Sequence, residues 1–262
     1  MRTLKLAALP MLLALAAPPG PAAAQDAKSH LVAGDAARCA RSIAGALGHF
    51  REALALDSLN YEANWKASRE LADSGKLMPD GLKRSRDSVY AEALALARRA
   101  VRVDSNGADG HYMVAVAAGR VALTKSQHER VKSAGVVRDA ALKALALDSL
   151  HDGAMHVMGR WNAEIQRLSG FQKFFARTFL GGSVFKEASW PNANRYFRAA
   201  IQVDPQNIYH HLDFAEALVD QDSTALARAE LEQVAQLPLG CDAGDPTYKQ
   251  QAAALLEKIS RQ

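Results

Sequence analysis

The stretch that decides the fold is residues 137–168, which read V-R-D-A-A-L-K-A-L-A-L-D-S-L-H-D-G-A-M-H-V-M-G-R-W-N-A-E-I-Q-R-L. Alanine and leucine dominate its first half, and both are strong helix formers. Asp148 and Ser149 interrupt the pattern, since Asp and Ser favour caps and turns over helix interiors. A second amphipathic segment starts at Asp152. The stretch therefore predicts a helix, a short break and a second helix.

The same arrangement recurs along the chain. Four breaks follow Ala-rich segments, at Asp57-Ser58, Asp104-Ser105, Asp148-Ser149 and Asp204-Pro205. Counting back 12, 8 and 5 residues from each Ser or Pro gives the sets Ala46/Phe50/Ala53, Ala93/Ala97/Ala100, Val137/Ala141/Ala144 and Ala193/Phe197/Ala200, and a fifth set, Ala227/Leu231/Val234, lies 34 residues beyond the fourth. Offsets of four and three place the members of each set on one helix face, where small residues allow a neighbouring helix to approach closely.

This spacing resembles the tetratricopeptide repeat (TPR), whose second helix carries small, aromatic and small residues at these offsets. The resemblance implies an all-α, TPR-like, right-handed solenoid of about five repeats with lengthened connections. We expect its first helices at residues 61–73, 108–123, 152–168 and 208–220. A helix from Asp245 through Ile259 should cap the solenoid, because an open end would leave an apolar face in water.

The connections between paired helices are longer than in a standard repeat. Successive breaks lie 47, 44 and 56 residues apart, whereas the standard period is 34 residues. The excess falls at 74–88, 124–133 and about 169–189. The first two insertions are polar and basic, and Lys76 lies in the first; they predict solvated helix extensions or loops. The third carries Phe171, Phe174, Phe175 and Phe179, whose spacing places them on one face of a helix. We interpret this stripe as core packing. The alternatives are a segment that fills the protein's own groove, a dimer contact or a membrane contact.

Residues 1–24 have the pattern of a signal peptide. Arg2 and Lys5 precede an apolar run, and small residues precede a predicted cleavage before Gln25. Residues 25–262 would then form one helical-repeat domain, exported to the periplasm or the cell exterior. Its formal charge falls from +4 to +2, which does not indicate a nucleic-acid partner. No later segment is apolar enough to cross a bilayer.

The two cysteines, Cys39 and Cys241, lie near opposite ends of the chain. They could pair in an oxidising compartment. The ends of an extended solenoid would lie beyond the reach of a disulfide. We therefore expect two free or buried thiols.

A central motif points to one family. Residues 156–161 (H-V-M-G-R-W), the Phe-rich segment ending at 179–182 (F-L-G-G) and the repeat ending at 200–205 (A-I-Q-V-D-P) together resemble the regulator of microtubule dynamics family, a TPR-like group with lengthened connections. The resemblance covers residues 50–259 and implies an exported bacterial relative. Microtubule binding is not carried over, since the predicted signal peptide is foreign to the cytoplasmic face on which microtubules lie.

The sequence contains no motif for catalysis, for a cofactor or for a metal. His151 and His156 are five residues apart, so they do not share a helix face. H-E-x-x-H, C-x-x-C, G-x-S-x-G and Gly-rich phosphate loops are all absent. We therefore expect no enzyme, no cofactor and no metal site.

The expected function is a protein-interaction scaffold that binds a protein or peptide on its concave face, which the first helices line. Candidate binding residues on these helices are Tyr61, Trp65, His111, Tyr112, His156, Arg160, Trp161 and His211. A packing interpretation is also open, in which Trp161 lies between repeats and Arg160 pairs with Glu164 at i+4. Alternative functions are a ligand or enzymatic pocket between the aromatic insertion and the central repeat, and a membrane-associated assembly factor.

Overall fold

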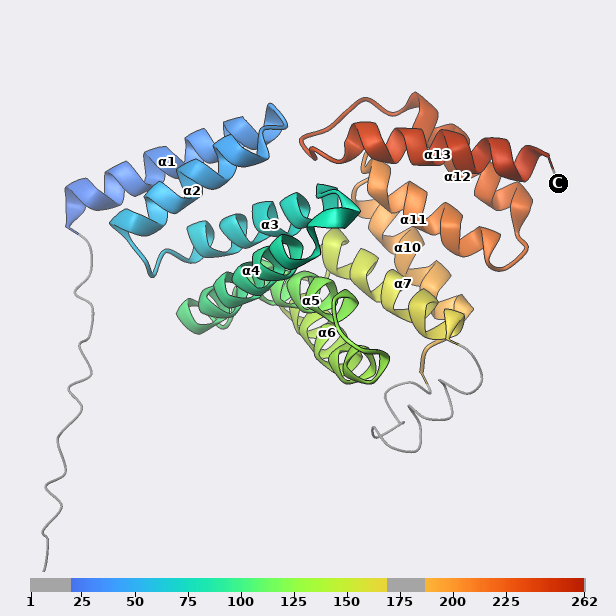
Figure 1. Cartoon of the computed structure of the whole chain (residues 1–262), viewed down its shortest axis with the longest axis horizontal. Helices are drawn as coiled ribbons and strands as arrows, with labels where there is room; N and C mark the ends of the chain where they lie inside the picture. Colours follow the sequence, from blue (N-terminus) through green and yellow to red (C-terminus); the bar gives the residue numbers. More distant parts are fainter. Residues whose placement is uncertain (1–19, 169–186, 262) are drawn as a thin grey trace, which may run out of the picture.

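The computed structural model describes residues 20–168 and 187–261, and these residues form helices and turns with no strand (Figure 1). The helices are α1 (Pro21–Cys39), α2 (Ile43–Leu56), α3 (Tyr61–Leu77), the 3-10 turn η1 (Asp80–Leu82), α4 (Lys83–Val103), α5 (Ala108–Leu123), α6 (Gln127–Leu147), α7 (Asp152–Arg167), α10 (Trp190–Val203), α11 (Ile208–Val219), α12 (Thr224–Gln236) and α13 (Asp245–Ser260). None of the described helices combines the length and apolarity needed to cross a bilayer.

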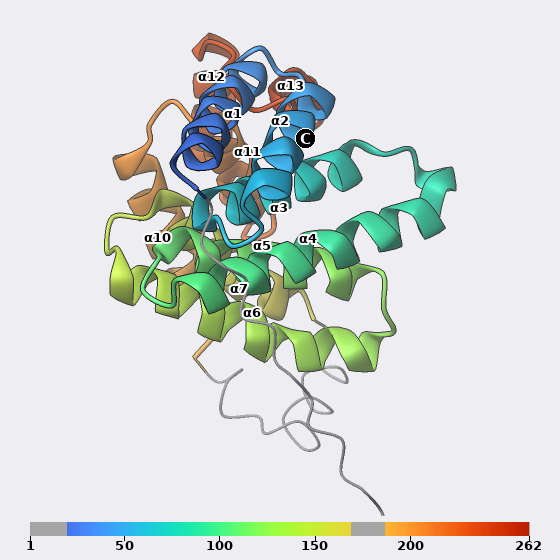
Figure 2. The same ribbon diagram turned by 90° about the vertical axis from the view of Figure 1, so that its left-hand side faces the viewer.

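The helices pack as successive pairs, α1 with α2, α3 with α4, α5 with α6, α7 with α10, and α11 with α12, and α13 covers the last pair. Figures 1 and 2 show these pairs following one curved path. The all-α, TPR-like fold is therefore confirmed. Each expected first helix begins at its expected residue, although α3 continues to Leu77. α1 was not among the predicted first helices, and it supplies the first helix of the first repeat.

The predicted sets on the second helices form the centre of the repeats. Every member is buried except Val137, which is half-buried. Phe50 and Phe197, the large members of their sets, are 0% and 1% exposed. Each packs against a glycine of the paired first helix: a Cβ on Gly34 would lie 2.3 Å from the Phe50 ring, and one on Gly159 would lie 2.8 Å from the Phe197 ring. Small residues on one helix thus admit an aromatic ring from the other.

The Asp-Ser and Asp-Pro breaks end the second helix of each repeat, but they do not cap the first helix of the next repeat. Asp57, Asp104, Asp148 and Asp204 each follow the last residue of a helix, and in each case Oδ1 accepts a hydrogen bond from the backbone N–H two residues later. The side chains of Asn60, His151 and Asn207 cap the helices that follow, because each accepts a hydrogen bond from a backbone N–H in the first turn. The Asp-Ser and Asp-Pro pairs therefore end the second helices, and the turn adds residues before the cap of the next helix.

The first two insertions extend helices that are already present. α3 runs on into the first insertion and α4 begins within it at Lys83, while α6 begins at Gln127 with Ser126 and Glu129 forming a capping box. The third insertion lies almost wholly outside the described residues. The Phe171 to Phe179 stripe and the alternative pocket beside it therefore stay predictions.

The ends of the solenoid meet, contrary to expectation. The Sγ atoms of Cys39 and Cys241 form a disulfide with an S–S distance of 2.11 Å. Beside it, Nη1 of Arg41 donates a hydrogen bond to the carbonyl of Gly240 over 3.1 Å. Figure 1 shows the α1–α2 turn next to the loop that precedes α13. The prediction of two unpaired thiols was wrong because it treated the solenoid as extended, whereas the helix pairs follow a tight curve.

Candidate partner-binding site

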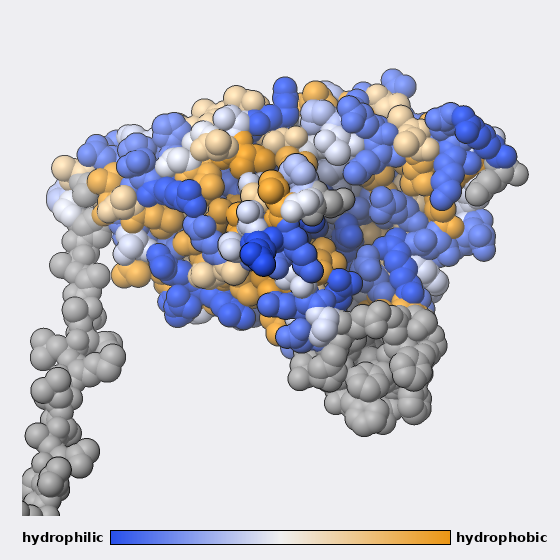
Figure 3. Space-filling model, viewed as in Figure 1, coloured by the Kyte–Doolittle hydropathy of each residue, from blue (hydrophilic) through white to orange (hydrophobic). Residues whose placement is uncertain are grey.

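The curve brings first helices from distant repeats together at the middle of the molecule. There Lys76 of α3, Arg120 of α5, Arg160 of α7, Tyr209 of α11 and Tyr248 of α13 form a group that we name the central cluster. The Lys76 Nζ atom lies 3.2 Å from the centroid of the Tyr209 ring and 4.1 Å from that of Tyr248. Figure 3 shows this face of the molecule, on which hydrophilic and hydrophobic residues are mixed where α3, α5 and α7 converge.

Arg160 is held by two partners from α11. Its Nη1 donates to the hydroxyl of Tyr209 over 2.5 Å and to Oδ2 of Asp213 over 2.9 Å. Asp213 is only 4% exposed. Burial alone would raise the pKa of Asp213, but Arg160, His156 and Lys76 together hold it below its usual range. The guanidinium therefore neutralises a carboxylate that has little contact with water.

A pair of buried histidines extends this network toward the start of α7. The Nδ1 atoms of His156 and His210 lie 3.0 Å apart, and Nε2 of His210 lies 2.9 Å from Oδ2 of Asp152. Nε2 of His156 lies 3.0 Å from Oδ2 of Asp213, without the alignment of a hydrogen bond. Burial lowers the pKa of His156 to about 4, although Asp213 acts in the opposite direction. His156 is thus neutral near pH 7.

The other two cations of the central cluster, Lys76 and Arg120, have no paired carboxylate in the described part of the chain. Among residues 20–168 and 187–261, neither Lys76 nor Arg120 lies within ion-pair distance of an acidic side chain. Burial, and next the charge of Arg120, lowers the pKa of Lys76 to about 7. Asp213 and Asp242 act on Lys76 in the opposite direction from a greater distance. Arg120 is therefore a cation of the cluster with no acidic side chain at ion-pair distance among the described residues.

The charges nearer the N-terminus, by contrast, are matched. Arg38 lies 2.7 Å from Glu70 and 3.0 Å from Asp73, and Arg69 lies 3.1 Å from Glu70. Lys66 is paired in the same way, with Asp35 and Glu62. Matched pairs of this kind leave little electrostatic attraction for a further ion.

Two of the eight candidate residues, Tyr61 and Trp161, support contacts between repeats. The Tyr61 hydroxyl accepts a hydrogen bond from the backbone N–H of Gly110 over 2.9 Å. Nε1 of Trp161 donates to the carbonyl of Ala134 over 2.8 Å, and Trp161 is 6% exposed. The position of Trp161 agrees with the packing interpretation.

Two further candidates, His111 and His211, contact the turns before their own helices. Nε2 of His111 lies 2.9 Å from the carbonyl oxygen of Ser105, and Nε2 of His211 lies 3.0 Å from that of Pro205. His211 also contacts Glu230 of α12 over 2.6 Å and is 4% exposed. Neither histidine belongs to the central cluster.

Of the remaining candidates, His156 and Arg160 belong to the network around Asp213, whereas Trp65 and Tyr112 are half-buried against the N-terminal core. The Trp65 ring lies under Arg69, whose guanidinium carbon is 5.1 Å from the ring centroid. Arg160 also lies 3.6 Å from Glu164, as the packing interpretation expects, but its nearest acidic partner is Asp213. The assignment of these four side chains to partner binding stays a prediction.

Most of the central cluster was not predicted from the sequence. Lys76 was placed in a solvated insertion, yet it is half-buried between two tyrosine rings. One available signal was the series Tyr209, Asp213, Glu216 and Asp220 along one face of α11, which faces Arg160 and Arg167 of α7. No local signal connects α3 with α11 and α13, because they meet only through the curvature.

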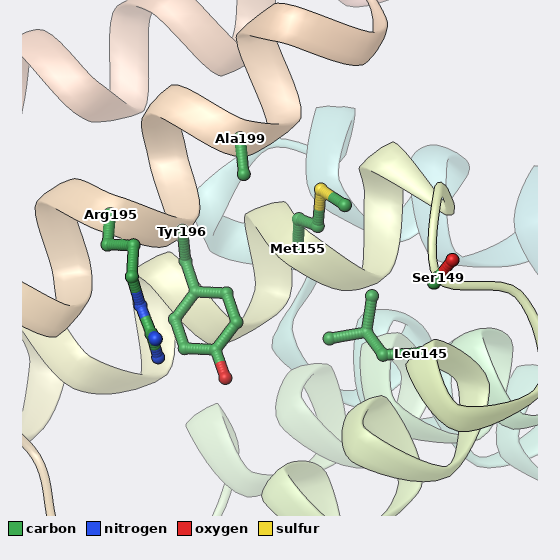
Figure 4. A pocket seen from close by; sticks show the side chains of 6 residues that line it. All are labelled: Leu145, Ser149, Met155, Arg195, Tyr196 and Ala199. Atoms are coloured by element: carbon green, nitrogen blue, oxygen red, sulfur yellow. The ribbon is translucent and has the colours of Figure 1, made fainter.

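A separate hollow lies between α6, α7 and α10 (Figure 4). Its volume is about 300 Å³, and it is lined by Leu145, Ser149, Met155, Arg195, Tyr196 and Ala199. Arg195 is the one charged side chain in this lining, so the hollow offers no acid and base pair. In the described part of the chain no three His, Cys, Asp or Glu side chains are grouped to hold a metal ion.

Comparison with solved structures supports the fold. A TPR protein from Thermus thermophilus superposes with a TM-score of 0.65 at 14% identity, covering 88% of this chain and 99% of that chain. PilF from Pseudomonas aeruginosa gives a TM-score of 0.50 at 13% identity, covering 92% and 93%. At this level of identity the similarity establishes the TPR-like architecture alone.

Comparison with known sequences identifies the family. Regulator of microtubule dynamics protein 1 from Bos taurus is 26% identical over 156 residues, and the protein of that name from Mus musculus is 25% identical over 153 residues. These alignments cover 58% of this chain and 47% and 49% of the relatives, so the chain matches about half the length of each relative. The sequence profile described as regulator of microtubule dynamics protein 1-3 matches residues 31–260. The chain therefore belongs to the regulator of microtubule dynamics protein 1-3 family.

Proposed function

We propose that this protein is a non-enzymatic scaffold that docks a peptide or protein segment on the surface formed by its first helices. The observation that carries the proposal is the convergence of half-buried aromatic and charged side chains from α3, α5, α7 and α11 on one inner surface. The TPR-like fold supports a role in protein interaction. Preformed helices lose little conformational entropy when a partner binds.

The affinity of such a surface would depend on a few anchors. Aromatic and Arg side chains carry most of the binding energy at protein interfaces. Trp65, Tyr112 and Arg160 are half-buried side chains of first helices, so each combines a fixed position with access to solvent. We assign the docking role to this surface rather than to Trp161 or His211, which are buried in contacts between helices.

We also propose that the scaffold acts in the periplasm or outside the cell. Residues 1–24 have the composition of a signal peptide, and the disulfide between Cys39 and Cys241 is of a kind that persists in oxidising compartments. We do not extend the microtubule role named for the relatives to this chain, since export would place it away from microtubules.

A photo-crosslinking experiment tests the docking surface. A photoreactive amino acid replaces Glu164, whose side chain is 53% exposed one turn beyond Arg160 on α7. The matched control carries the same group at Leu226 on α12, which is 52% exposed. After incubation of the mature chain with periplasmic extract, we expect a discrete crosslinked partner from position 164 and none from position 226. Equal crosslinking from both positions would contradict docking on the first helices.

A further inference from the structure

We propose that the disulfide between Cys39 and Cys241 is a thiol–disulfide exchange site, through which a dithiol opens and closes the two ends of the solenoid. The co-reactant is the dithiol, which is oxidised as the disulfide is reduced. The consequence is a change in the spacing of the first and last repeats. The inference adds regulation to the docking surface, and in that respect it rests on the proposed function.

Few contacts other than the disulfide join α1–α3 to α11–α13, a junction that we name the seam. The buried apolar residues of α1–α5 form one cluster, those of α7 and α10–α13 form another, and the two clusters share no residue. Among the described residues the seam is crossed by an exposed hydrogen bond, from Nη1 of Arg41 to the carbonyl of Gly240, and by the contact of Lys76 with the rings of Tyr209 and Tyr248. No common apolar core therefore holds the ends together once the S–S bond is broken.

Both cysteines of the disulfide are exposed to solvent. Cys39 is the last residue of α1, and Cys241 lies in the loop between α12 and α13 (Figure 1). Exposed disulfides exchange with external thiols more readily than buried ones, and regulatory disulfides belong to this class. A thiolate can therefore reach the S–S bond without prior unfolding of either apolar cluster.

The exchange proceeds in two displacements. A thiolate of the dithiol attacks one Sγ atom, the S–S bond breaks, and its electron pair leaves on the other Sγ atom, which takes a proton from water. The second thiolate of the dithiol then attacks the mixed disulfide and releases the remaining cysteine, which is protonated in turn. The dithiol loses two electrons and becomes a disulfide, while Cys39 and Cys241 become thiols. The reverse reaction, with the oxidised dithiol, closes the bond again.

Reduction should alter the inner surface because the seam carries part of the central cluster. Lys76 belongs to α3, on the N-terminal side of the seam, whereas Tyr209 and Tyr248 belong to α11 and α13 on the other side. The disulfide links residues 202 positions apart, so its loss removes a strong restraint on this contact. The oxidised state thus fixes the spacing of the first helices that a docked segment would contact.

The rate of reduction tests whether exchange occurs in the folded chain. The mature chain is treated with dithiothreitol, free thiols are alkylated at intervals, and the peptides that contain Cys39 and Cys241 are quantified by mass spectrometry. We expect a rate that is proportional to the concentration of dithiothreitol and unchanged by urea below the unfolding transition, because the exposed bond is attacked directly. A rate that rises with urea and does not depend on dithiothreitol would overturn the inference, since unfolding would then be the limiting step.

Lysine acylation tests whether reduction opens the seam. An amine-reactive ester labels Lys76 in the oxidised and the reduced chain, and Lys143, which is exposed on α6, is the matched control. We expect the labelling of Lys76 to rise about tenfold on reduction, because a contact without its covalent restraint opens locally more often, and the labelling of Lys143 to stay unchanged. The double variant Cys39→Ser, Cys241→Ser should show the reduced pattern without reductant. Unchanged labelling of Lys76 in the reduced native chain would overturn the inference whether or not the variant folds.

Two further measurements separate the exchange site from folding and from docking. Circular dichroism of the reduced chain should retain the helical signal, and its loss would overturn the inference by making the disulfide a requirement for folding. Crosslinking from position 164 is then repeated with the oxidised and the reduced chain, and equal capture of a partner in both states would overturn the regulation. If no partner is captured in either state while reduction and Lys76 labelling behave as expected, the proposed function fails and the exchange site stands.

Discussion

Phe197 illustrates how one side chain joins the two helices of a repeat. It is 1% exposed, lies over Gly159 of α7, and its ring centroid is 5.6 Å from that of Phe214 on α11. Replacing Phe197 by Ala should lower the free energy of unfolding by about 3–5 kcal/mol, because the buried ring leaves a cavity. Urea denaturation measures the loss, with Leu226→Ala as the exposed control. An unchanged midpoint for Phe197→Ala would contradict the repeat register.

His156 makes stability depend on pH. Burial lowers its pKa to about 4 in the folded chain, whereas an unperturbed histidine has a pKa of about 6.5. Between these values the unfolded chain binds a proton that the folded chain does not. The free energy of unfolding should therefore fall as the pH drops from about 6.5 to about 4, by roughly 3 kcal/mol in total.

The test of this pH dependence is denaturation across the window, compared between the native chain and His156→Asn. His210, Asp213 and Arg160 face His156 and remain in the variant. The variant should show a shallower fall, even if its stability at pH 7 is lower. His111→Gln, which removes a histidine outside the network, should keep the native slope. If the free energy of unfolding of His156→Asn changed with pH as steeply as that of the native chain, the pH dependence would arise from other groups.

At the scale of elements, α7 and α11 are joined by two ion pairs of different burial. Arg160 meets the buried Asp213, while Arg167 meets Asp220 at the surface over 2.6 Å. Arg160→Ala should cost about 2–3 kcal/mol, less than the full penalty for a buried pair, because the Arg160 side chain is 35% exposed. Arg167→Ala should cost at most about 1 kcal/mol.

Urea denaturation of the two variants checks this difference, and similar small losses would show that Asp213 is better solvated than its burial indicates. The comparison also bears on the search for a partner. Since Arg160 stabilises the fold, loss of binding in Arg160→Ala would not by itself locate a docking site. Arg120, which has no acidic partner among the described residues, is the more informative position.

The second helices were more predictable than the first. The offsets of 12, 8 and 5 residues located buried positions such as Phe50 and Leu231, because the spacing of small and aromatic residues on one helix face is a local pattern. The inner faces of α3, α5 and α7 were not predictable in this way. Their chemistry depends on which helix they face, and the placement of Lys76 in a solvated insertion shows the consequence.

At the scale of the whole molecule, the Cys39–Cys241 disulfide closes the curved solenoid. It links residues 202 positions apart. The double variant Cys39→Ser, Cys241→Ser should lose about 2–5 kcal/mol of stability and have a larger radius of gyration, because the first and last repeats can separate. Denaturation and small-angle scattering with and without reductant measure both effects. Reductant should lower the stability and increase the radius of gyration of the native chain and leave the double variant unaffected. If the native chain gave identical curves with and without reductant, the disulfide would not hold the ends together.

The sequence by itself determined the helical pairs from α3 onward, the register of the five second helices and the family, because helix periodicity, turn-forming Asp residues and small-residue faces act over a few residues. Only the tertiary structure decided that Cys39 meets Cys241 and that Lys76 lies between Tyr209 and Tyr248. Both contacts arise from superhelical curvature, the sum of small rotations between successive helix pairs. Each rotation depends on packing across two helices and on the lengthened connections, so no single stretch of sequence encodes where the ends of the chain will meet.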